Sequence, residues 1–282
     1  MGQVNIAYVI PKDVPVMMMG DNPHYKRPMK TLYLLHGFSG NECDWEYNGI
    51  AEDIAFKYNM AVIMITGGNN FYLDRKATGA QYCTYAGKEV HPERNASYST
   101  FIGKELIERT RDMFNLSHKR EDTYIAGISM GGYGALLNGL LYSDVFSKVA
   151  AFSPATDPYM LLCDPAKGGF GDAEFANMFG SFEEYEKSKW NITRTYTEAD
   201  KKDIPELFIG CGDRDIAVDS QVKCFRKALD GAGVPYRFWE TTGNHDFEAW
   251  EKMMDPAFSF LTGIPEGSRN SLAIPDSIME GK

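Results

Sequence analysis

No stretch of the 282-residue sequence is apolar for long enough to form a transmembrane helix. The apolar runs Leu32–Leu35 and Met60–Ile65 are far shorter than the ~18 residues that a membrane span needs. Residues 1–5 have neither the basic nor the apolar segment of a secretory signal. We therefore expect no membrane association and a cytoplasmic protein, or a secreted one if a signal was removed before cloning.

The sequence also has little positive charge. Its 29 Lys and Arg residues are outnumbered by 39 Asp and Glu, which gives a net charge of -10, and no basic cluster is longer than a pair. A protein that binds nucleic acid through its phosphates needs a continuous basic surface. The charge pattern therefore predicts that nucleic acid is not a partner.

Paired cysteines are missing as well. The five cysteines are widely spaced, and none stands in the CxxC pair that is typical of zinc sites and redox dithiols. No spacing of His, Asp and Glu suggests a metal site either. We expect no metal, no cofactor and reduced thiols at Cys43, Cys83, Cys163, Cys211 and Cys224.

Short apolar runs of β type alternate with segments of helical periodicity. This alternation is typical of an α/β fold in which helices cover both faces of a mostly parallel sheet. The alternating stretch Val4–Ile10 suits an antiparallel edge strand. The expected strands are 31–35, 60–65, 123–126, 148–152, 206–209 and 236–240, and the expected helices lie near 102–113, 132–141, 218–229 and 247–260.

The segment Thr156–Asp203 interrupts this alternation. It contains no good strand, but a helix is expected near Glu174–Trp190. We interpret the segment as a lid-like insertion within one domain of residues 1–262, which is followed by a loosely attached extension, 263–282. Aromatic residues in the insertion are interleaved with Asp and Glu, which predicts a segment that closes a small pocket rather than a lipid-binding surface. Residues 11–28 are expected to form a loop or hairpin.

The strongest chemical signal is the G-x-S-x-G pattern at Gly127–Gly131. It follows the expected strand 123–126 and precedes a helical run, which is the context of a nucleophile elbow. The sharp turn between strand and helix leaves no room for side chains at the two glycines and pushes the serine outward. We therefore predict that Ser129 is a nucleophile.

A serine hydroxyl needs a base, and the base needs an orienting carboxylate, in the chain order Ser, Asp or Glu, His. His245 is the only histidine after Ser129, and it follows the last expected strand. The turn after the strand 206–209 offers two acids, Asp213 and Asp215. We favour Asp215 as the acid, with Asp213 as the alternative that shapes the turn or pairs with Arg214.

Two backbone N–H groups are needed to bind the oxyanion that forms during acyl transfer. The residue after the nucleophile, Met130, is expected to supply one of them. The Gly-containing loop after the strand 31–35 is expected to supply the other through Phe38. His36 in this loop is interpreted as a structural residue rather than a second base.

Aromatic residues near the expected cleft are candidates for lining an acyl or aryl pocket. Most aromatic residues belong to the core, so a place in the core is the favoured alternative for each of them. The candidates are Trp45, Tyr72 and Tyr82, together with Tyr47 and Phe71.

Four motifs in this order resemble the esterase D-like branch of the α/β-hydrolases, which includes tributyrin, feruloyl and acetyl-xylan esterases, S-formylglutathione hydrolases and mycolyltransferases. The resemblance extends from about Val4 to Leu261. It implies Ser129 as nucleophile, His245 as base, Asp215 as acid, and Phe38 and Met130 as oxyanion amides. The motifs are Leu34–Glu42, Gly127–Ala135, Cys211–Asp215 and Gly243–Phe247.

The resemblance also bears on the substrate. The formylglutathione hydrolases have histidines at the positions of Ile128 and Tyr133 in this sequence. An oxygen ester is therefore favoured over a glutathione thioester. We expect a serine carboxylesterase for short-chain acyl or aryl esters, with acetyl, butyryl, feruloyl and acetyl-xylan esters as candidates. The alternatives are an acyltransferase and an S-formylglutathione-type thioesterase, and a non-catalytic binding module is the least favoured alternative. The sequence leaves open whether the protein forms a homo-oligomer.

Overall fold

A computed structural model describes most of the chain. Residues 12–28 of the loop or hairpin expected at 11–28, the pocket candidate Tyr82 and the end of the chain after Glu266 lie outside the described residues. The structure describes residues 4–11, 29–47, 49–76, 83–85, 88–90, 95–163 and 171–266.

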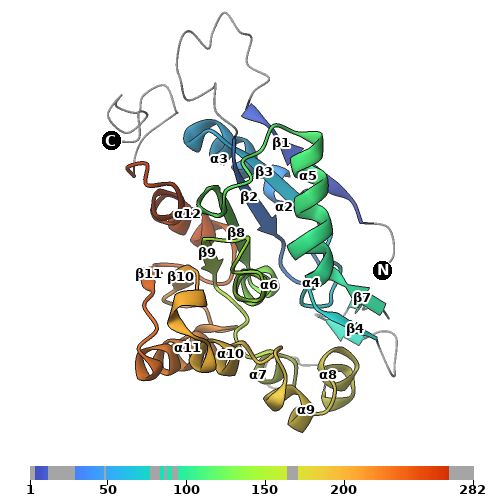
Figure 1. Cartoon of the computed structure of the whole chain (residues 1–282). Helices are drawn as coiled ribbons and strands as arrows, with labels where there is room; N and C mark the ends of the chain where they lie inside the picture. The colour runs from blue at the N-terminus through green and yellow to red at the C-terminus, as the bar shows by residue number, and fades with distance from the viewer. Residues whose placement is uncertain are drawn as a thin grey trace, which may run out of the picture.

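A seven-stranded sheet forms the centre of the molecule, with the strand order β1-β3-β2-β8-β9-β10-β11 (Figure 1). Strand β1 pairs antiparallel with β3, and the other neighbours in this sheet pair in parallel. The predicted mostly parallel sheet and its antiparallel edge strand are therefore confirmed. The strands are β1 (Ile6–Val9), β2 (Lys30–Leu35), β3 (Met60–Ile65), β8 (Thr123–Ile128), β9 (Lys148–Phe152), β10 (Glu206–Gly212) and β11 (Arg237–Thr241).

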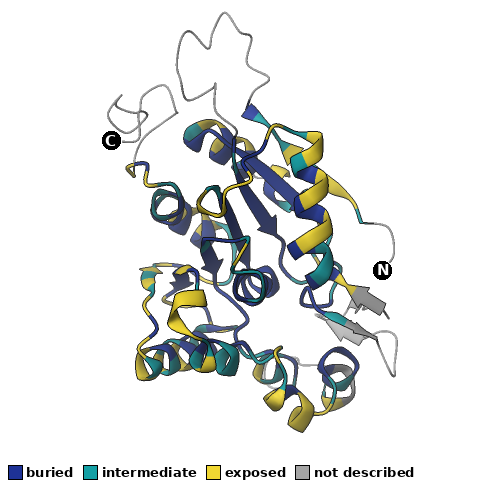
Figure 2. Ribbon diagram, in the orientation of Figure 1, coloured by how far each residue is buried: buried dark blue, intermediate teal, exposed yellow. Residues whose placement is uncertain are grey.

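Helices cover both faces of this sheet, so its central strands are buried (Figure 2). Side chains alternate along a strand, and on β2 Leu32 and Leu34 pack on one face while Tyr33 and Leu35 pack on the other. The first face is covered by α2 (Asp44–Tyr47), α3 (Ile50–Tyr58) and α12 (Phe247–Thr262); the second is covered by η3 (Phe101–Leu106), α5 (Ile107–Met113), α6 (Met130–Leu141) and α11 (Asp219–Ala232).

The insertion between β9 and β10 is helical and lies beyond the carboxyl ends of the strands (Figure 1). The prediction of a single helix near Glu174–Trp190 is wrong. One helix ends at Gly180, which has φ 84°, and the next begins after Ser181, which forms a capping box with Glu184. The insertion contains α7 (Pro158–Cys163), α8 (Asp172–Phe179), α9 (Phe182–Lys187), α10 (Ile192–Glu198) and η6 (Lys201–Asp203).

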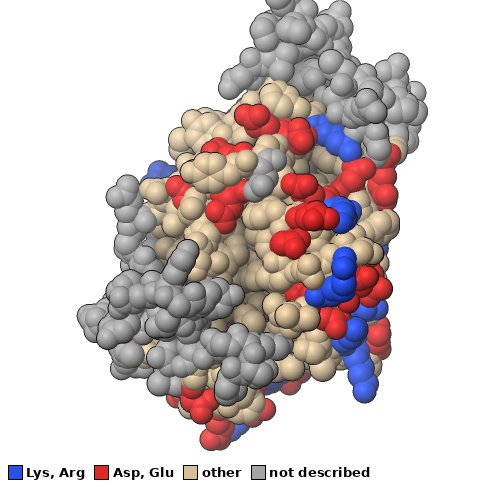
Figure 3. Space-filling model, turned by 180° about the vertical axis from the view of Figure 1, so that it is seen from behind, with Lys and Arg blue, Asp and Glu red and all other residues tan. Residues whose placement is uncertain are grey.

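Smaller elements complete the described chain. Two short antiparallel pairs, β4 with β7 and β5 with β6, lie between β3 and α5. Lys and Arg side chains are interspersed with Asp and Glu on the face shown in Figure 3. None of the helices in the described ranges combines the length and apolarity needed to cross a bilayer. The remaining elements are β4 (Asp74–Lys76), β5 (Cys83–Tyr85), β6 (Lys88–Val90), β7 (Asn95–Ser97), α4 (Tyr98–Thr100) and η4 (Arg120–Asp122).

Candidate active site

Ser129 occupies a strained backbone conformation between β8 and α6, with φ 54° and ψ -116°. Such a conformation costs about 1–3 kcal/mol for a residue other than glycine, so the surroundings must hold it. The N–H of Ser129 donates to the carbonyl of Phe152 at 2.9 Å, and its carbonyl accepts from the N–H of Ala155 at 3.0 Å. These two bonds tie the turn to the end of β9 and present the serine side chain at the edge of the sheet.

The glycines on either side of Ser129 are required by close packing. A Cβ atom on Gly127 would lie 2.4 Å from the carbonyl oxygen of Gly131. A Cβ atom on Gly131 would lie 2.3 Å from the carbonyl oxygen of Leu35 on β2. Both distances are shorter than van der Waals contact, and the clashing atoms belong to backbone. The G-x-S-x-G spacing therefore reflects the narrow gap through which this turn passes.

The structure brings Ser129, His245 and Asp215 into one hydrogen-bonded chain. Nε2 of His245 lies 2.9 Å from Oγ of Ser129, and Nδ1 of His245 lies 2.8 Å from Oδ2 of Asp215. The three residues follow β8, β10 and β11, which run parallel in the sheet with β9 between β8 and β10, so their carboxyl ends lie at one edge of the sheet. The Asp215 side chain is fully buried, while that of His245 is 25% exposed and open to a ligand.

Asp215 is held in its ionised form. Burial raises the pKa of this carboxyl, but the hydrogen bond and the charge of His245 outweigh burial and leave the pKa below its ordinary value. Its Oδ1 also accepts from the N–H groups of Ala217 and Val218, each at 3.2 Å. A carboxylate at this place keeps the proton of His245 on Nδ1, so Nε2 faces Ser129 as an acceptor.

Asp213 has a different position. Its Oδ1 accepts from the N–H of Gly243 at 3.0 Å and lies 3.5 Å from Nε of Arg214. It thereby ties the turn after β10 to the loop that carries His245. Asp213 therefore has the turn-shaping role that was its alternative in the sequence analysis.

Two backbone segments border Ser129 where an oxyanion would form. Met130 begins α6, and the first N–H groups of a helix have no partner within the helix. A Cβ atom on Gly37 would lie 3.6 Å from Cβ of Ser129, which places the turn before Phe38 beside the serine. Both amides proposed for oxyanion binding therefore come from segments next to Ser129.

His36 braces the loop that contains Gly37. Its Nδ1 donates to the carbonyl of Gly37 at 2.6 Å, and its Nε2 accepts from the N–H of Gly67 at 2.7 Å. This pattern requires a neutral ring with one proton. Burial lowers the pKa of His36 below its ordinary value, which favours the same neutral form.

The described pocket candidates lie mainly in the core. Trp45 and Tyr72 have no exposed surface, and the Tyr72 hydroxyl donates to the carbonyl of His36 at 2.9 Å. The expectation that these two residues line an open pocket is therefore corrected: Trp45 packs against Phe247 under α12, and Tyr72 supports the loop of His36. Phe71 is buried and Tyr47 is 82% exposed.

Trp250 is a neighbour of the site that the sequence reasoning missed. Its ring meets the imidazole of His245 edge to face, with centroids 5.2 Å apart and planes at 86°. Asp246, the residue between His245 and α12, caps this helix by accepting from the N–H of Ala249 at 3.0 Å. The spacing of Phe247 and Trp250, three residues apart on a helix directly after the histidine, was the available signal.

A hydroxyl, an imidazole and a buried carboxylate in this order can transfer an acyl group. The imidazole removes the proton of the hydroxyl as its oxygen attacks a carbonyl, and the carboxylate stabilises the imidazolium that forms. This arrangement needs no metal ion to generate its nucleophile.

Comparison with known proteins agrees with the fold and the chemistry. The family model described as "Putative esterase" matches residues 9–261. An acetyl esterase of Caldicellulosiruptor saccharolyticus is 31% identical over 250 residues, which cover 84% of this chain and 85% of the relative.

Solved structures of serine hydrolases have the same architecture. The substrate-bound fluorophosphonate-binding serine hydrolase F of Staphylococcus aureus is 28% identical, with a TM-score of 0.70 and 92% of each chain covered. The S-formylglutathione hydrolase FrmB of the same organism is 26% identical, with a TM-score of 0.65 and the same coverage of 92% of each chain. The chain therefore belongs to the esterase family, has the α/β-hydrolase fold and is a serine carboxylic ester hydrolase.

Proposed function

We propose that this enzyme hydrolyses short-chain acyl and aryl oxygen esters through an acyl-enzyme formed on Ser129. The observation that carries the proposal is the hydrogen-bonded chain from Ser129 through His245 to Asp215, with distances of 2.9 and 2.8 Å. In the first half-reaction Oγ of Ser129 attacks the ester carbonyl while Nε2 of His245 takes its proton. The tetrahedral intermediate collapses, and the alcohol leaves with that proton.

The second half-reaction uses the same groups. Water gives a proton to His245 and attacks the acyl carbonyl, and the acid is released as the proton returns to Ser129. The N–H groups of Met130 and Phe38 bind the oxyanion in both half-reactions, and Asp215 stabilises the imidazolium. The hydrogen bonds of the Ser129 backbone to Phe152 and Ala155 keep the hydroxyl in place throughout.

A cluster of aromatic rings beside the elbow favours substrates with a short acyl group. Tyr133 lies one helical turn after Ser129, and its ring meets Phe71 at a centroid distance of 5.4 Å. Phe71 in turn contacts Phe179 at 5.2 Å and the half-buried Phe38 at 6.2 Å. A long acyl chain on this side would have to displace buried rings, whereas an acetyl or butyryl group needs little room.

An S-formylglutathione thioesterase is the second candidate, because the similar structure of FrmB carries that name. Ile128 and Tyr133 argue against it. Ile128 lies in the core, and the hydroxyl of Tyr133 donates to the carbonyl of Trp190 at 2.5 Å. Neither side chain is placed to meet a glutathione moiety.

Steady-state hydrolysis of p-nitrophenyl acetate and of S-formylglutathione, by the wild type and by Ser129→Ala, tests the proposal. We expect the oxygen ester to give the higher kcat/KM and the substitution to abolish both reactions. Product analysis with and without an added acceptor alcohol separates hydrolysis from acyl transfer. A predominant transfer product, or a preference for the thioester, would contradict the proposal.

A further inference from the structure

The turn that carries Phe38 has a conformation that its sequence disfavours. The N–H of Gly40 donates to the carbonyl of Gly37 at 3.1 Å and closes a β-turn with Phe38 and Ser39 in its middle. Ser39 has φ 64°, whereas the φ of Phe38 is not positive. These signs are those of a type II turn, which prefers Gly or Asn at its third position. A serine at this position is strained, so another contact must hold the turn.

Asn69 supplies that contact. Its Oδ1 accepts from the N–H of Ser39 at 2.6 Å. This N–H belongs to the peptide between Phe38 and Ser39, and the same peptide flips when a type II turn converts to type I. In the type I form Ser39 would have a negative φ and no strain. The bond from Asn69 therefore stabilises the strained form of the turn against the relaxed one.

The preceding peptide of the turn is held by His36. Its Nδ1 donates to the carbonyl of Gly37 at 2.6 Å. The C=O and N–H of a trans peptide point in opposite directions, so this bond aims the N–H of Phe38 away from His36. A Cβ atom on Gly37 would lie 3.6 Å from Cβ of Ser129, so the turn borders the nucleophile. His36 and Asn69 thus each hold one of the two peptides that adjoin Phe38.

The loop that carries Asn69 is itself well supported. On one side of Asn69 the N–H of Gly67 donates to Nε2 of His36 at 2.7 Å. On the other side Oδ1 of Asn70 accepts from the N–H of Tyr72 at 3.0 Å, and the Tyr72 hydroxyl donates to the carbonyl of His36 at 2.9 Å. The carboxamide of Asn69 therefore acts from a fixed place beside the turn.

We propose, on the basis of the esterase function above, that Asn69 is a positioning residue for the oxyanion hole. It keeps the turn in the form that aims the N–H of Phe38 at the oxygen of the substrate carbonyl. Without its bond the peptide between Phe38 and Ser39 flips, which changes ψ of Phe38 and moves that N–H. Because full negative charge on this oxygen develops only on the way to the tetrahedral intermediate, the loss acts on kcat rather than KM.

Asn69→Ala removes the bond and leaves the triad intact. We expect kcat for p-nitrophenyl acetate to fall about 10- to 100-fold, with KM changed less than about 3-fold, because a small misplacement of a catalytic group is costly. The Ki of a trifluoromethyl ketone, whose adduct with Ser129 carries an oxyanion, should rise by a similar factor. A higher KM at constant kcat, or an unchanged Ki, would overturn the proposal.

Ser39→Gly separates the strain of the turn from a contact with the substrate. Glycine adopts φ 64° without strain, so the turn no longer depends on Asn69. Adding Asn69→Ala to the Ser39→Gly protein should therefore lower kcat less than about 3-fold relative to Ser39→Gly alone. An equal loss in both backgrounds would show that Asn69 does not act through this turn.

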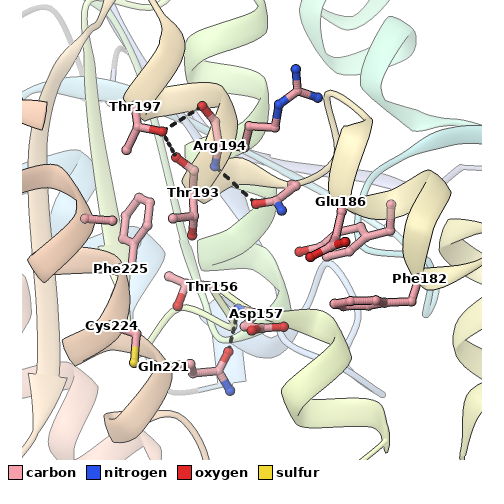
Figure 4. A pocket seen from close by; sticks show the side chains of 13 residues that line it. Thr156, Asp157, Phe182, Glu186, Thr193, Arg194, Thr197, Gln221, Cys224 and Phe225 are labelled. Atoms are coloured by element: carbon pink, nitrogen blue, oxygen red, sulfur yellow. Dashed lines mark hydrogen bonds between the residues drawn. The ribbon is translucent and has the colours of Figure 1, made fainter.

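Two other asparagines provide matched controls, because each accepts one backbone N–H through Oδ1. Asn41 accepts from Cys43 at 2.8 Å, just after the turn. Asn191 accepts from Arg194 at 3.1 Å, in the wall of a pocket between α9, α10 and α11 whose lining residues include none of the triad (Figure 4). Ala at either position should keep kcat within about 2-fold, and Asn191→Ala should lower the melting temperature through the lost helix cap. Losses of kcat like that of Asn69→Ala would contradict a specific role for Asn69.

Hydrogen exchange tests the bond without turnover. Ser39 is exposed, so the bond to Asn69 rather than burial protects its N–H. We expect this amide to exchange at least about 10-fold faster in Asn69→Ala than in the wild type. Unchanged exchange, with an active wild type, would overturn the positioning role and leave the proposed function standing. A wild type that hydrolyses no ester would overturn the proposed function and this role with it.

Discussion

The ring of Trp250 stands edge to face against the imidazole of His245, with centroids 5.2 Å apart. Trp250 is 6% exposed and belongs to α12, which begins two residues after the histidine. It also contacts Phe247 at 4.9 Å, and Phe247 contacts Trp45 at 6.1 Å. The catalytic loop is therefore anchored to an aromatic column that extends into the core.

Replacing Trp250 by Leu should lower kcat about 10-fold with little change in KM, because an aromatic pair is worth about 0.5–1.5 kcal/mol and the imidazole would lose its orientation. Trp250→Phe keeps a ring against His245 and should lose less than about 3-fold. Steady-state kinetics well below each variant's melting temperature measure the difference. A fall in stability with unchanged kcat in the Leu variant would make Trp250 a core residue only.

Asp215→Asn should reduce kcat by about 10⁴-fold, because an amide cannot stabilise the imidazolium and favours the wrong tautomer of His245. Asp213→Asn is the matched control two residues away, and an amide oxygen there can still accept from Gly243. We expect it to keep most of its activity. Equal losses in the two variants would move the acid to Asp213.

The neutral state of His36 predicts a dependence of stability on pH. Its folded pKa is lowered by burial, so its contribution to stability is complete above the unfolded pKa and is lost as the pH falls through the folded pKa. Protonation of Nε2 would also set two N–H donors, those of His36 and Gly67, against each other. Asp215 stays ionised in this range because its pKa is lowered.

Urea unfolding of the wild type and His36→Gln between pH 7 and pH 5 measures this contribution. The free energy of unfolding of the wild type should fall more steeply with decreasing pH, by up to about 1.4 kcal/mol per pH unit for one proton. Parallel slopes for the two proteins would show that His36 does not take up a proton on unfolding.

The framework of the site could be predicted from sequence because its signals are local. The elbow glycines, the strand before them and the order of Ser129, Asp215 and His245 each follow from short patterns. The core strands could be predicted because parallel strands buried on both faces are continuous apolar runs.

Features that depend on distant contacts could not be predicted. The sequence around an aromatic residue such as Trp45 or Tyr72 is the same whether the ring lines a cleft or fills the core. Only the packing of Trp45 against α12 and of Tyr72 against the loop of His36 places these rings in the core. Asp157 and Gln221 are far apart in sequence and meet only because the insertion packs on α11. The helix break at Gly180 had a readable signal in the capping box of Ser181 and Glu184.

The length of the acyl chain gives a further prediction. The rings of Phe71, Tyr133 and Phe179 are buried and in contact, so room for the acyl group is limited. Activity on p-nitrophenyl esters should be highest from acetyl to butyryl and fall steeply by octanoyl, with no rise in rate above the critical micelle concentration. Similar kcat/KM values for butyrate and palmitate would identify a lipase instead.

The most direct measurement of the central claim is the mass of the peptide that contains Ser129 after reaction with a fluorophosphonate. The account predicts one adduct, located on Ser129, which forms in step with the loss of esterase activity. Ser129→Ala should form no adduct and should have kcat lowered by about 10⁴-fold or more. An adduct on another residue, or a Ser129→Ala protein that keeps a tenth of the wild-type activity, would contradict it.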